Sequence, residues 1–340
     1  KKIGKPSIYY GVLLMDGDNM GKWLSGEKAP KISDVLHPVV ANSLDSGWSS
    51  FVNMERPLNP SLHLSISKAL RDFSLRVVRE VVEKDHLGKL VYAGGDDVLA
   101  FVSLKDLPEV MKKLRAYFSG SISMDLETNK LNIDFNDGAG YVPLDNEGNP
   151  INIGSGRPVK GLLLTMGTTA TASMGIVIAH HSSNLSQVLE EVRRCEKKAK
   201  EIKNKDAFCM ALAKRAGGTE YFSSKWYAGA NHSETVSALQ EWIDVFSSDY
   251  ISPKMVYAFR TETKGLTNLP KDAIKMELFR IGDRQRNKKK KDFDKDKLKV
   301  MVGRLMDLVP DESKEIVGNG IEYLSVFLSV AAFLGREENR

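Results

Sequence analysis

Cysteine is scarce in this chain of 340 residues, and that scarcity removes several classes of protein. Cys195 and Cys209 are its two cysteines and no Cys-x-x-Cys pair occurs, so neither a disulfide framework nor a structural zinc site is expected. No signal peptide opens the sequence, and the most apolar stretch, residues 321–334, contains Glu322 and is too short to span a bilayer. We therefore expect a soluble, cytoplasmic protein with no membrane contact.

The excess of positive over negative charge is also small, since the net charge is only +5. A dense run of positive charge, Arg284–Lys291, lies between two predicted helices. Such a run can contact the phosphates of RNA or be a solvated loop, and the sequence leaves both readings open. No aromatic side chains are interleaved with it, so stacking on nucleic-acid bases is not indicated there.

What the sequence does contain is a pair of adjacent carboxylates at the tip of a predicted hairpin. Gly94-Gly95-Asp96-Asp97 lies between two apolar runs with strand character, residues 90–93 and 98–102. Adjacent aspartates repel each other and lose hydration when a turn packs, and a divalent cation is the usual way to stabilise them. The hairpin therefore predicts a metal site of the kind that nucleotidyl-transfer enzymes use.

A second acidic turn follows another strand-like run. Residues 8–15 are apolar and end in Asp16-Gly17-Asp18-Asn19-Met20-Gly21, whose glycines allow the backbone to turn or to approach a phosphate closely. If the two strands are neighbours, Asp16, Asp96 and Asp97 can share a pair of Mg²⁺ or Mn²⁺ ions that substrate phosphates complete. For either motif taken alone, an ordinary turn on the protein surface is an equally good interpretation.

The order of the predicted elements indicates an α+β fold of the ferredoxin-like, palm type. After the first strand, apolar residues at helical spacing predict a helix over 61–81, and the acidic hairpin follows it. A helix over 108–117, a strand over 171–179, a helix over 185–203 and a strand over 207–213 complete the pattern. This split βαβ order predicts a mostly antiparallel sheet with its helices on one face.

Two stretches, residues 22–60 and 119–168, interrupt this pattern. The first contains several prolines and the second is rich in glycine, asparagine and aspartate, so both are expected to be insertions. Beyond residue 221 the pattern changes to helical stripes. We therefore predict two domains, a palm over residues 1–221 and an all-α bundle over 222–340. Further helices of the bundle are expected at 254–264, 270–283, 294–308 and 312–335.

These motifs, in this order and spacing, resemble the second palm domain of the large subunit of type III CRISPR effector complexes of the Cmr type. Residues 171–181 are similar to that family's next palm strand, and Ala199-Lys200-Glu201 with Asn204-Lys205-Asp206-Ala207 resembles the end of its following helix. Lys214-Arg215-Ala216-Gly217-Gly218 resembles the Arg-Ser-Gly segment that closes the palm, with Ala216 in place of serine. The family's large subunit also has a nuclease-type domain and a first palm, so the chain is expected to be a fragment.

The resemblance implies an RNA-activated cyclase that joins ATP into cyclic oligoadenylates by two-metal-ion 3′–5′ nucleotidyl transfer. The implied partners are the small subunit, the subunit that binds the 5′ handle of the crRNA, the crRNA and target RNA. Asp16, Asp96 and Asp97 are the expected catalytic residues, and with the carbonyl of Gly17 they hold the metal ions. The residues expected to contact the nucleotide are Gly17, Asp18, Asn19, Gly94, Gly95, Ser173, Lys200 and Lys205.

Three other functions stay open. A diguanylate-type cyclase would use GTP, but it normally has glutamate where Asp97 stands and lacks the two insertions. A template-dependent polymerase needs finger and thumb elements, which the sequence does not reveal. The third is a catalytically silent palm that acts as a scaffold for crRNA, target RNA and other subunits, and the intact acids on both turns argue against it. Lys200 and Lys205, expected at the triphosphate, can alternatively be ordinary cations at a helix C-terminus.

Overall fold

The computed structural model describes residues 7–125, 130–133, 140–145, 147–151, 159–215, 217–228, 233–266, 269–310 and 320–338. Ala216 of the palm-closing segment lies outside the described residues, as do parts of the insertion predicted at 119–168 and of the helix predicted at 312–335. Within the described ranges, no helix is both long and apolar enough to cross a membrane.

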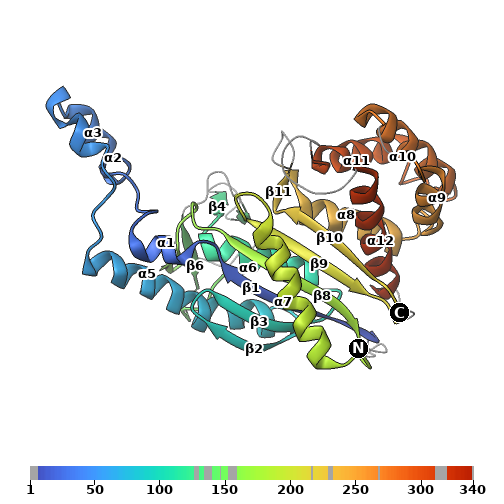
Figure 1. The fold of residues 1–340 in the computed structure, drawn as a ribbon, viewed down its shortest axis with the longest axis horizontal. Coiled ribbons are helices and arrows are strands. Elements are labelled where there is room, and N and C mark those ends of the chain that lie inside the picture. Colours follow the sequence, from blue (N-terminus) through green and yellow to red (C-terminus); the bar gives the residue numbers. More distant parts are fainter. Residues whose placement is uncertain are drawn as a thin grey trace.

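A six-stranded sheet forms the centre of the molecule (Figure 1). Its strands are β1 (Tyr9–Gly17), β2 (Gly88–Gly94), β3 (Asp97–Val102), β8 (Ala172–His180), β9 (Ala207–Ala213) and β10 (Thr219–Lys225). They lie in the order β10-β9-β8-β1-β3-β2, and each neighbouring pair is antiparallel except β8 with β9. The order and directions of β8, β1, β3 and β2 are those of a ferredoxin-like sheet, which confirms the predicted α+β fold class.

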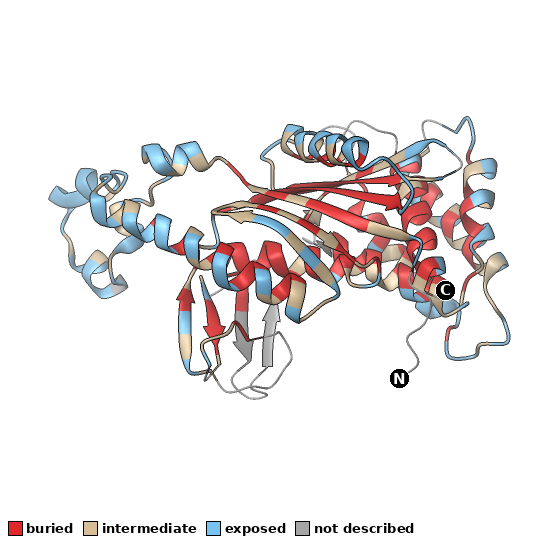
Figure 2. Ribbon diagram, turned by 90° about the horizontal axis from the view of Figure 1, so that it is seen from below, coloured by how far each residue is buried: buried red, intermediate tan, exposed pale blue. Residues whose placement is uncertain are grey.

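Helices cover the sheet on both faces (Figure 2), so the prediction of helices on one face was wrong. On one face, α6 (Leu107–Ser119) and the long helix after Pro60 pack in the same apolar cluster as Leu13 of β1. On the other face, α7 (Leu185–Glu201) packs against Val12 of β1. The two helices of the ferredoxin-like unit share a face as expected, but α7 connects the parallel strands β8 and β9, and that crossover places it on the opposite side.

The helix predicted over 61–81 is confirmed and extends slightly further at both ends. α5 (Pro60–Asp72) begins after Asn59, whose side chain accepts a hydrogen bond from the Leu62 amide. It continues into two wider, π-helical turns, η2 (Phe73–Val77) and η3 (Glu80–Lys84), which carry the apolar residues that face the sheet.

The first predicted insertion forms an arm of short helices, part of which extends away from the sheet (Figure 1). The second predicted insertion contains two small antiparallel hairpins. The elements of the arm are α1 (Met20–Ser25), α2 (Ile32–Val35), α3 (Pro38–Ser43), η1 (Ser46–Trp48) and α4 (Ser49–Val52). The hairpins pair β4 (Ile122–Asp125) with β5 (Lys130–Ile133), and β6 (Tyr141–Leu144) with β7 (Gly161–Leu164).

Helices dominate the chain after the sheet, as the sequence predicted. β10 crosses the expected domain boundary and extends the sheet to Lys225, and the division into two domains stays a prediction. A short hairpin of β11 (Tyr227–Ala228) and β12 (Ser233–Glu234) follows. The helices are α8 (Thr235–Ser247), α9 (Lys254–Glu262), α10 (Lys271–Gln285), α11 (Lys295–Leu308) and α12 (Gly320–Glu338).

The basic run at 284–291 is not a free loop along its whole length. α10 extends through its first residues, Arg284 pairs with Glu262 of α9, and Arg286 forms a 3.0 Å ion pair with Asp283. These pairs hold the start of the run within the helical part of the molecule. The lysines at 288–291 are therefore the main source of exposed charge in the run.

Close packing of α7 on β8 depends on Gly175. A methyl group at this position would lie 2.4 Å from both the backbone nitrogen of Glu196 and the carbonyl oxygen of Val192. We predict that Gly175→Ala lowers the free energy of unfolding by about 1–3 kcal/mol, because the helix must move away from the sheet. Urea denaturation measures this, with Gly21→Ala as the control, since a methyl group there has no neighbour within 4 Å. Equal stability of the two variants would contradict the prediction.

An ion-pair cluster joins the sheet to the helices. Glu220 of β10 accepts hydrogen bonds from Lys214 at 2.7 Å and from both terminal nitrogens of Arg260, on α9, at 2.9 and 3.1 Å. Burial of the carboxyl opposes ionisation, but these hydrogen bonds outweigh it and lower the pKa of Glu220 to about 2.

The lowered pKa of Glu220 makes a prediction about stability and pH. Because the folded pKa lies below the unfolded one, the stabilisation is full above about pH 4.5 and is lost as the pH falls towards 2. Glu220→Gln should cost about 1–2 kcal/mol at pH 7, after allowance for solvent screening, and nearly nothing at pH 2. Thermal or urea unfolding across this pH range tests it. As a control, Glu241→Gln disrupts an exposed pair with Arg304 and should cost little at either pH.

Candidate active site

The register between β1 and β3 brings the two acidic turns together. Met15 of β1 lies opposite Val98 of β3, so the next positions along these strands are Asp16 and Asp97. Asp96 precedes Asp97 at the tip of the hairpin that joins β2 to β3. The two motifs, about 80 residues apart in sequence, therefore meet because their strands pair directly.

One carboxylate oxygen from each of Asp16, Asp96 and Asp97 lies within 4.8 Å of the others. Oxygen ligands lie about 2.0–2.6 Å from Mg²⁺ or Ca²⁺, so three oxygens at this spacing can surround a divalent cation. These are the three aspartates that the sequence predicted would converge. We call them the acidic cluster.

The acidic cluster is electrostatically unfavourable by itself. Burial raises the pKa of Asp96, and the neighbouring charge of Asp97 raises it further. Burial also raises the pKa of Asp97. Both shifts mean that the protein destabilises the charged carboxylates, and a cation between them would relieve that cost.

Two residues at the C-terminal end of α7 add charges of both signs to the site. Lys200 forms an ion pair with Asp16 and a second one, at 2.8 Å, with Glu196 one helical turn earlier. Burial and the nearby charge of Lys205 lower the pKa of Lys200 to about 8. Glu196 has a raised pKa because it is buried and because Asp97 and Asp18 lie near it. The sequence analysis missed Glu196, although its i, i+4 spacing from Lys200 could have indicated it.

The carboxylate of Asp18 is buried and hydrogen-bonded, which the sequence did not indicate. Its side chain is only 1% exposed and accepts hydrogen bonds from the hydroxyls of Thr171 and Ser173, each at 2.8 Å. A third bond, at 2.9 Å, comes from the backbone amide of Asp206. Ser173 is fully buried and its hydroxyl donates to Asp18, which argues against the prediction that Ser173 contacts the nucleotide.

The loop that carries Lys205 is held in an uncommon conformation. Asn204, Lys205 and Asp206 all have positive φ angles, between 51° and 62°, a region that residues with side chains rarely occupy. Besides the amide bond to Asp18, the side chain of Asp206 forms a 2.7 Å ion pair with the buried Arg115 of α6. These contacts fix the loop and with it the backbone of Lys205 beside the end of α7.

Glycine is required at two places in the acidic turns. Gly95 has a φ of +72°, which lets the hairpin turn at that position. A methyl group at Gly17 would lie 2.9 Å from the Cβ and a carboxylate oxygen of Asp96, so only glycine allows this close approach. Asn19 also has a positive φ, of 57°, and precedes α1. The nucleotide contacts predicted for Gly17, Gly94, Gly95 and Asn19 stay predictions.

Comparison with known protein families assigns the sheet to a family. The model of the family described as Cas10/Cmr2, second palm domain, matches residues 9–142 and 162–209. This chain belongs to the Cas10/Cmr2 family. The match covers β1, both acidic turns and α7, so every residue of the acidic cluster lies in the Cas10/Cmr2 palm.

Two curated relatives agree with this assignment. The chain is 33% identical over 218 residues to the CRISPR system Cmr subunit Cmr2 of Pyrococcus furiosus, covering 64% of this chain and 20% of that protein. It is 40% identical over 63 residues to the CRISPR system CMR subunit Cmr2 of Saccharolobus solfataricus, covering 18% of this chain and 6% of that protein. The chain thus spans about a fifth or less of the curated relatives that it matches.

The fold is similar to that of chains in two cryo-EM structures of type III-B Cmr-beta. The apo state aligns over 98% of this chain and 39% of the other, with a TM-score of 0.59 and 15% identity. The state bound to cognate target RNA aligns over 97% of this chain and 40% of the other, with a TM-score of 0.58 and 16% identity. Because the alignments cover nearly the whole chain, the likeness includes the helical part beyond the Cas10/Cmr2 palm.

The contacts of Asp18 lead to a prediction that separates it from the acidic cluster. Asp18→Ala in this palm should lower the free energy of unfolding by about 3 kcal/mol, because it leaves the buried hydroxyl of Ser173, the partly buried hydroxyl of Thr171 and one amide without their charged acceptor. Asp16→Asn should change stability by less than about 1 kcal/mol, since the pair of Asp16 with Lys200 is partly exposed to solvent and Lys200 keeps Glu196 as a second partner. Urea denaturation in EDTA tests both variants, and an equal loss of stability in the two would refute the distinction.

Proposed function

We propose that this chain carries the nucleotide-cyclising palm of an RNA-guided type III CRISPR complex, which joins ATP into cyclic oligoadenylates. The observation that carries the proposal is the convergence of Asp16, Asp96 and Asp97 at the ends of adjacent strands in a Cas10/Cmr2 palm. Nucleotidyl transfer needs such a cluster to hold metal ions against a triphosphate. Within the described site, positioning and charge stabilisation supply most of the catalysis, and no side-chain nucleophile is required.

The donor set fits Mg²⁺ or Mn²⁺, because carboxylate and carbonyl oxygens are the hard ligands that these ions prefer. Asp16, Asp96 and Asp97 would hold two ions, with the backbone carbonyl of Gly17 as a further donor. When bound, the ions activate the attacking 3′ hydroxyl and neutralise the charge of the departing pyrophosphate. Gly17 lies close to Asp96, since a methyl group there would lie 2.9 Å from a carboxylate oxygen of Asp96.

Lys200 and Lys205 are proposed to hold the triphosphate. The ammonium group of Lys200 contacts Asp16, and Lys205 lies near enough to lower the pKa of Lys200. Two ammonium groups therefore stand beside the acidic cluster, and lysine is a common phosphate ligand. The contacts of Asp206 with Asp18 and Arg115 fix the loop, so Lys205 is held near the site before the nucleotide arrives.

The proposed setting is the large subunit of a cytoplasmic RNA-guided complex. The partners would be the small subunit, the subunit that binds the 5′ handle of the crRNA, the crRNA and target RNA. The chain's likeness to Cmr-beta, in a state bound to target RNA as well as in the apo state, supports this setting. The proposed arrangement is a palm over residues 1–221 and a helical domain over 222–340.

Nucleotide binding with Mn²⁺ tests the acidic cluster directly. Isothermal titration of ATP into the chain should show binding that EDTA abolishes and that Asp96→Asn with Asp97→Asn weakens at least tenfold, because the metal ligands are lost. The double variant should keep its fold and its thermal stability, since the substitutions remove two repelling charges. Asp34→Asn, on the exposed arm, is the matched control and should bind ATP like the parent chain.

Other outcomes point to other functions. A clear preference for GTP over ATP would favour a diguanylate-type cyclase. Mn²⁺-dependent ATP binding that survives in the double variant would place the site elsewhere and overturn the proposal. Absence of specific Mn²⁺ binding to the parent chain would favour the scaffold function, with the acidic cluster serving no catalytic purpose.

A further inference from the structure

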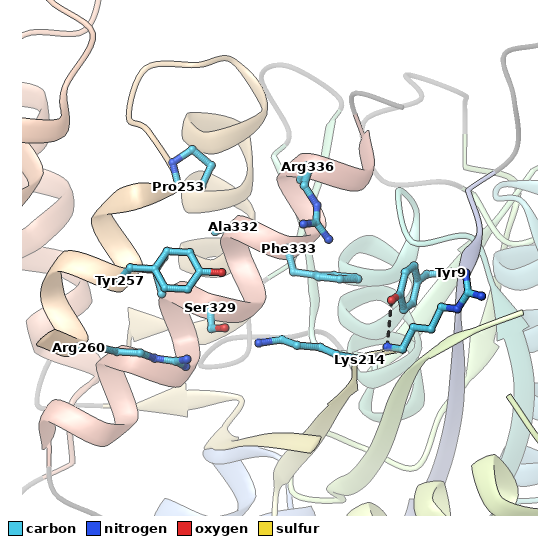
Figure 3. A pocket seen from close by; sticks show the side chains of 11 residues that line it. Tyr9, Lys214, Pro253, Tyr257, Arg260, Ser329, Ala332, Phe333 and Arg336 are labelled. Carbon is cyan, nitrogen blue, oxygen red and sulfur yellow. Dashed lines mark hydrogen bonds between the residues drawn. The ribbon is translucent and has the colours of Figure 1, made fainter. Parts of the chain in front are cut away.

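A pocket lies at the opposite end of β1 from the acidic cluster. It has a volume of about 600 Å³ and opens between α9, α12 and the end of β9 (Figure 3). Tyr9, which begins β1, lines it, whereas Asp16 lies seven residues further along the strand. At about 3.3 Å per residue, the pocket is roughly 23 Å from the acidic cluster. It is large enough for a small-molecule ligand, and the proposed function does not use it.

The pocket wall combines aromatic and cationic side chains. Among the described residues that line it, four are cationic and none is acidic. Its aromatic residues are Tyr9, Tyr257 and Phe333, and its cationic residues are Lys214, Arg215, Arg260 and Arg336. Aromatic rings beside cations are suited to ligands that join a flat ring to an anionic group.

The aromatic residues differ in what they can offer. The ring of Tyr9 packs between His180 and Phe333, at centroid distances of 5.1 and 4.8 Å, and its hydroxyl accepts a hydrogen bond from the Arg215 amide. Tyr257 on α9 is 71% exposed, and Figure 3 shows its ring projecting from the helix at the pocket. Tyr9 and Phe333 therefore form the fixed wall, and Tyr257 is the ring whose face is open to a ligand.

The cations differ in the same way. Lys214 and Arg260 are bound to Glu220, so much of their charge is neutralised. Within the described part of the chain, no ion pair joins Arg215 to an acidic side chain, and Arg215 is exposed. Arg336 is also exposed and stacks over the ring of Phe333 at 5.0 Å, and its ion pair with Glu337, at 3.6 Å, is longer than those of Lys214 and Arg260 with Glu220. Arg215, and Arg336 with its longer ion pair and exposed side chain, are therefore the guanidinium groups best placed to bind an anion.

We propose that this pocket binds a nucleotide, with its phosphate held by Arg215 and Arg336 and its base stacked on Tyr257. Guanidinium groups bind phosphate through paired hydrogen bonds, and an exposed tyrosine stacks on any base. The apolar residues Pro253 and Val256 flank Tyr257 and would exclude water from the base. The nucleotide is either a free one or a unit of single-stranded RNA, two sources with the same recognition chemistry. The proposal does not rest on the metal-dependent function of the acidic cluster.

Binding measurements in the presence of EDTA test this pocket separately from the acidic cluster, because EDTA removes the metal that the cluster requires. The probes are a fluorescein-labelled octa-adenylate RNA, ATP, and polyphosphate as an anion without bases. Arg215→Gln, Arg336→Gln and Tyr257→Leu should each weaken RNA or ATP binding at least fivefold. Tyr257→Phe keeps the stacking face and should bind like the parent chain. Arg193→Gln, an exposed arginine on α7, is the matched control and should also bind like the parent chain.

The pattern across probes decides the outcome. If the parent chain binds RNA but little ATP, and the variants lose RNA binding, the ligand is an RNA strand. If the parent chain binds ATP but little RNA, and the variants lose ATP binding, the ligand is a free nucleotide. Polyphosphate binding should fall in the arginine variants but not in Tyr257→Leu. The proposal is overturned if neither RNA nor ATP responds to the arginine variants, or if Tyr257→Leu binds both as the parent chain does. Circular dichroism of each variant confirms that the helices are intact.

Discussion

The antiparallel pairing of β1 with β3 is the constraint on which the rest of the site depends. It places Asp16 beside Asp97 and brings Asp96 close to the backbone of Gly17. A shift of the register by one residue would turn the carboxylates to the other face of the sheet. The register is fixed by the two apolar faces of β1, where Leu13 packs on one side and Val12 on the other. Core packing and site geometry are therefore set by the same strand.

The structure distinguishes the two aspartates of the first acidic turn. Asp16 faces the other carboxylates and a lysine, whereas Asp18 is buried and saturated by three donors. Those donors come from β8, from the residue that precedes it and from the loop after α7. Asp18 thus ties the ends of two strands together beneath the site. The carboxylate charge that Lys200 offsets only in part is concentrated on the acidic cluster, where a metal ion would bind.

Several expectations from the sequence hold because they depend on short stretches of chain. The α+β class, the hairpin at Gly94–Asp97, the helix after residue 60 and the strand at 207–213 follow from local alternation, helical spacing and glycine turns. The expectation of helices on one face failed for α7, because its place depends on β8 and β9 being parallel. The strand β10 was missed, since its polar alternation at 219–225 resembles that of an exposed loop.

By itself, the sequence determined where apolar strands end in carboxylates, since this is a property of neighbouring residues. Only the tertiary structure decided which distant groups meet. Asp18 accepts from Ser173 and from the amide of Asp206, 155 and 188 residues away along the chain. The aromatic and cationic pocket likewise gathers residues from β1, α9 and α12. Strand order and helix crossovers set such contacts, and no local pattern in the sequence encodes them.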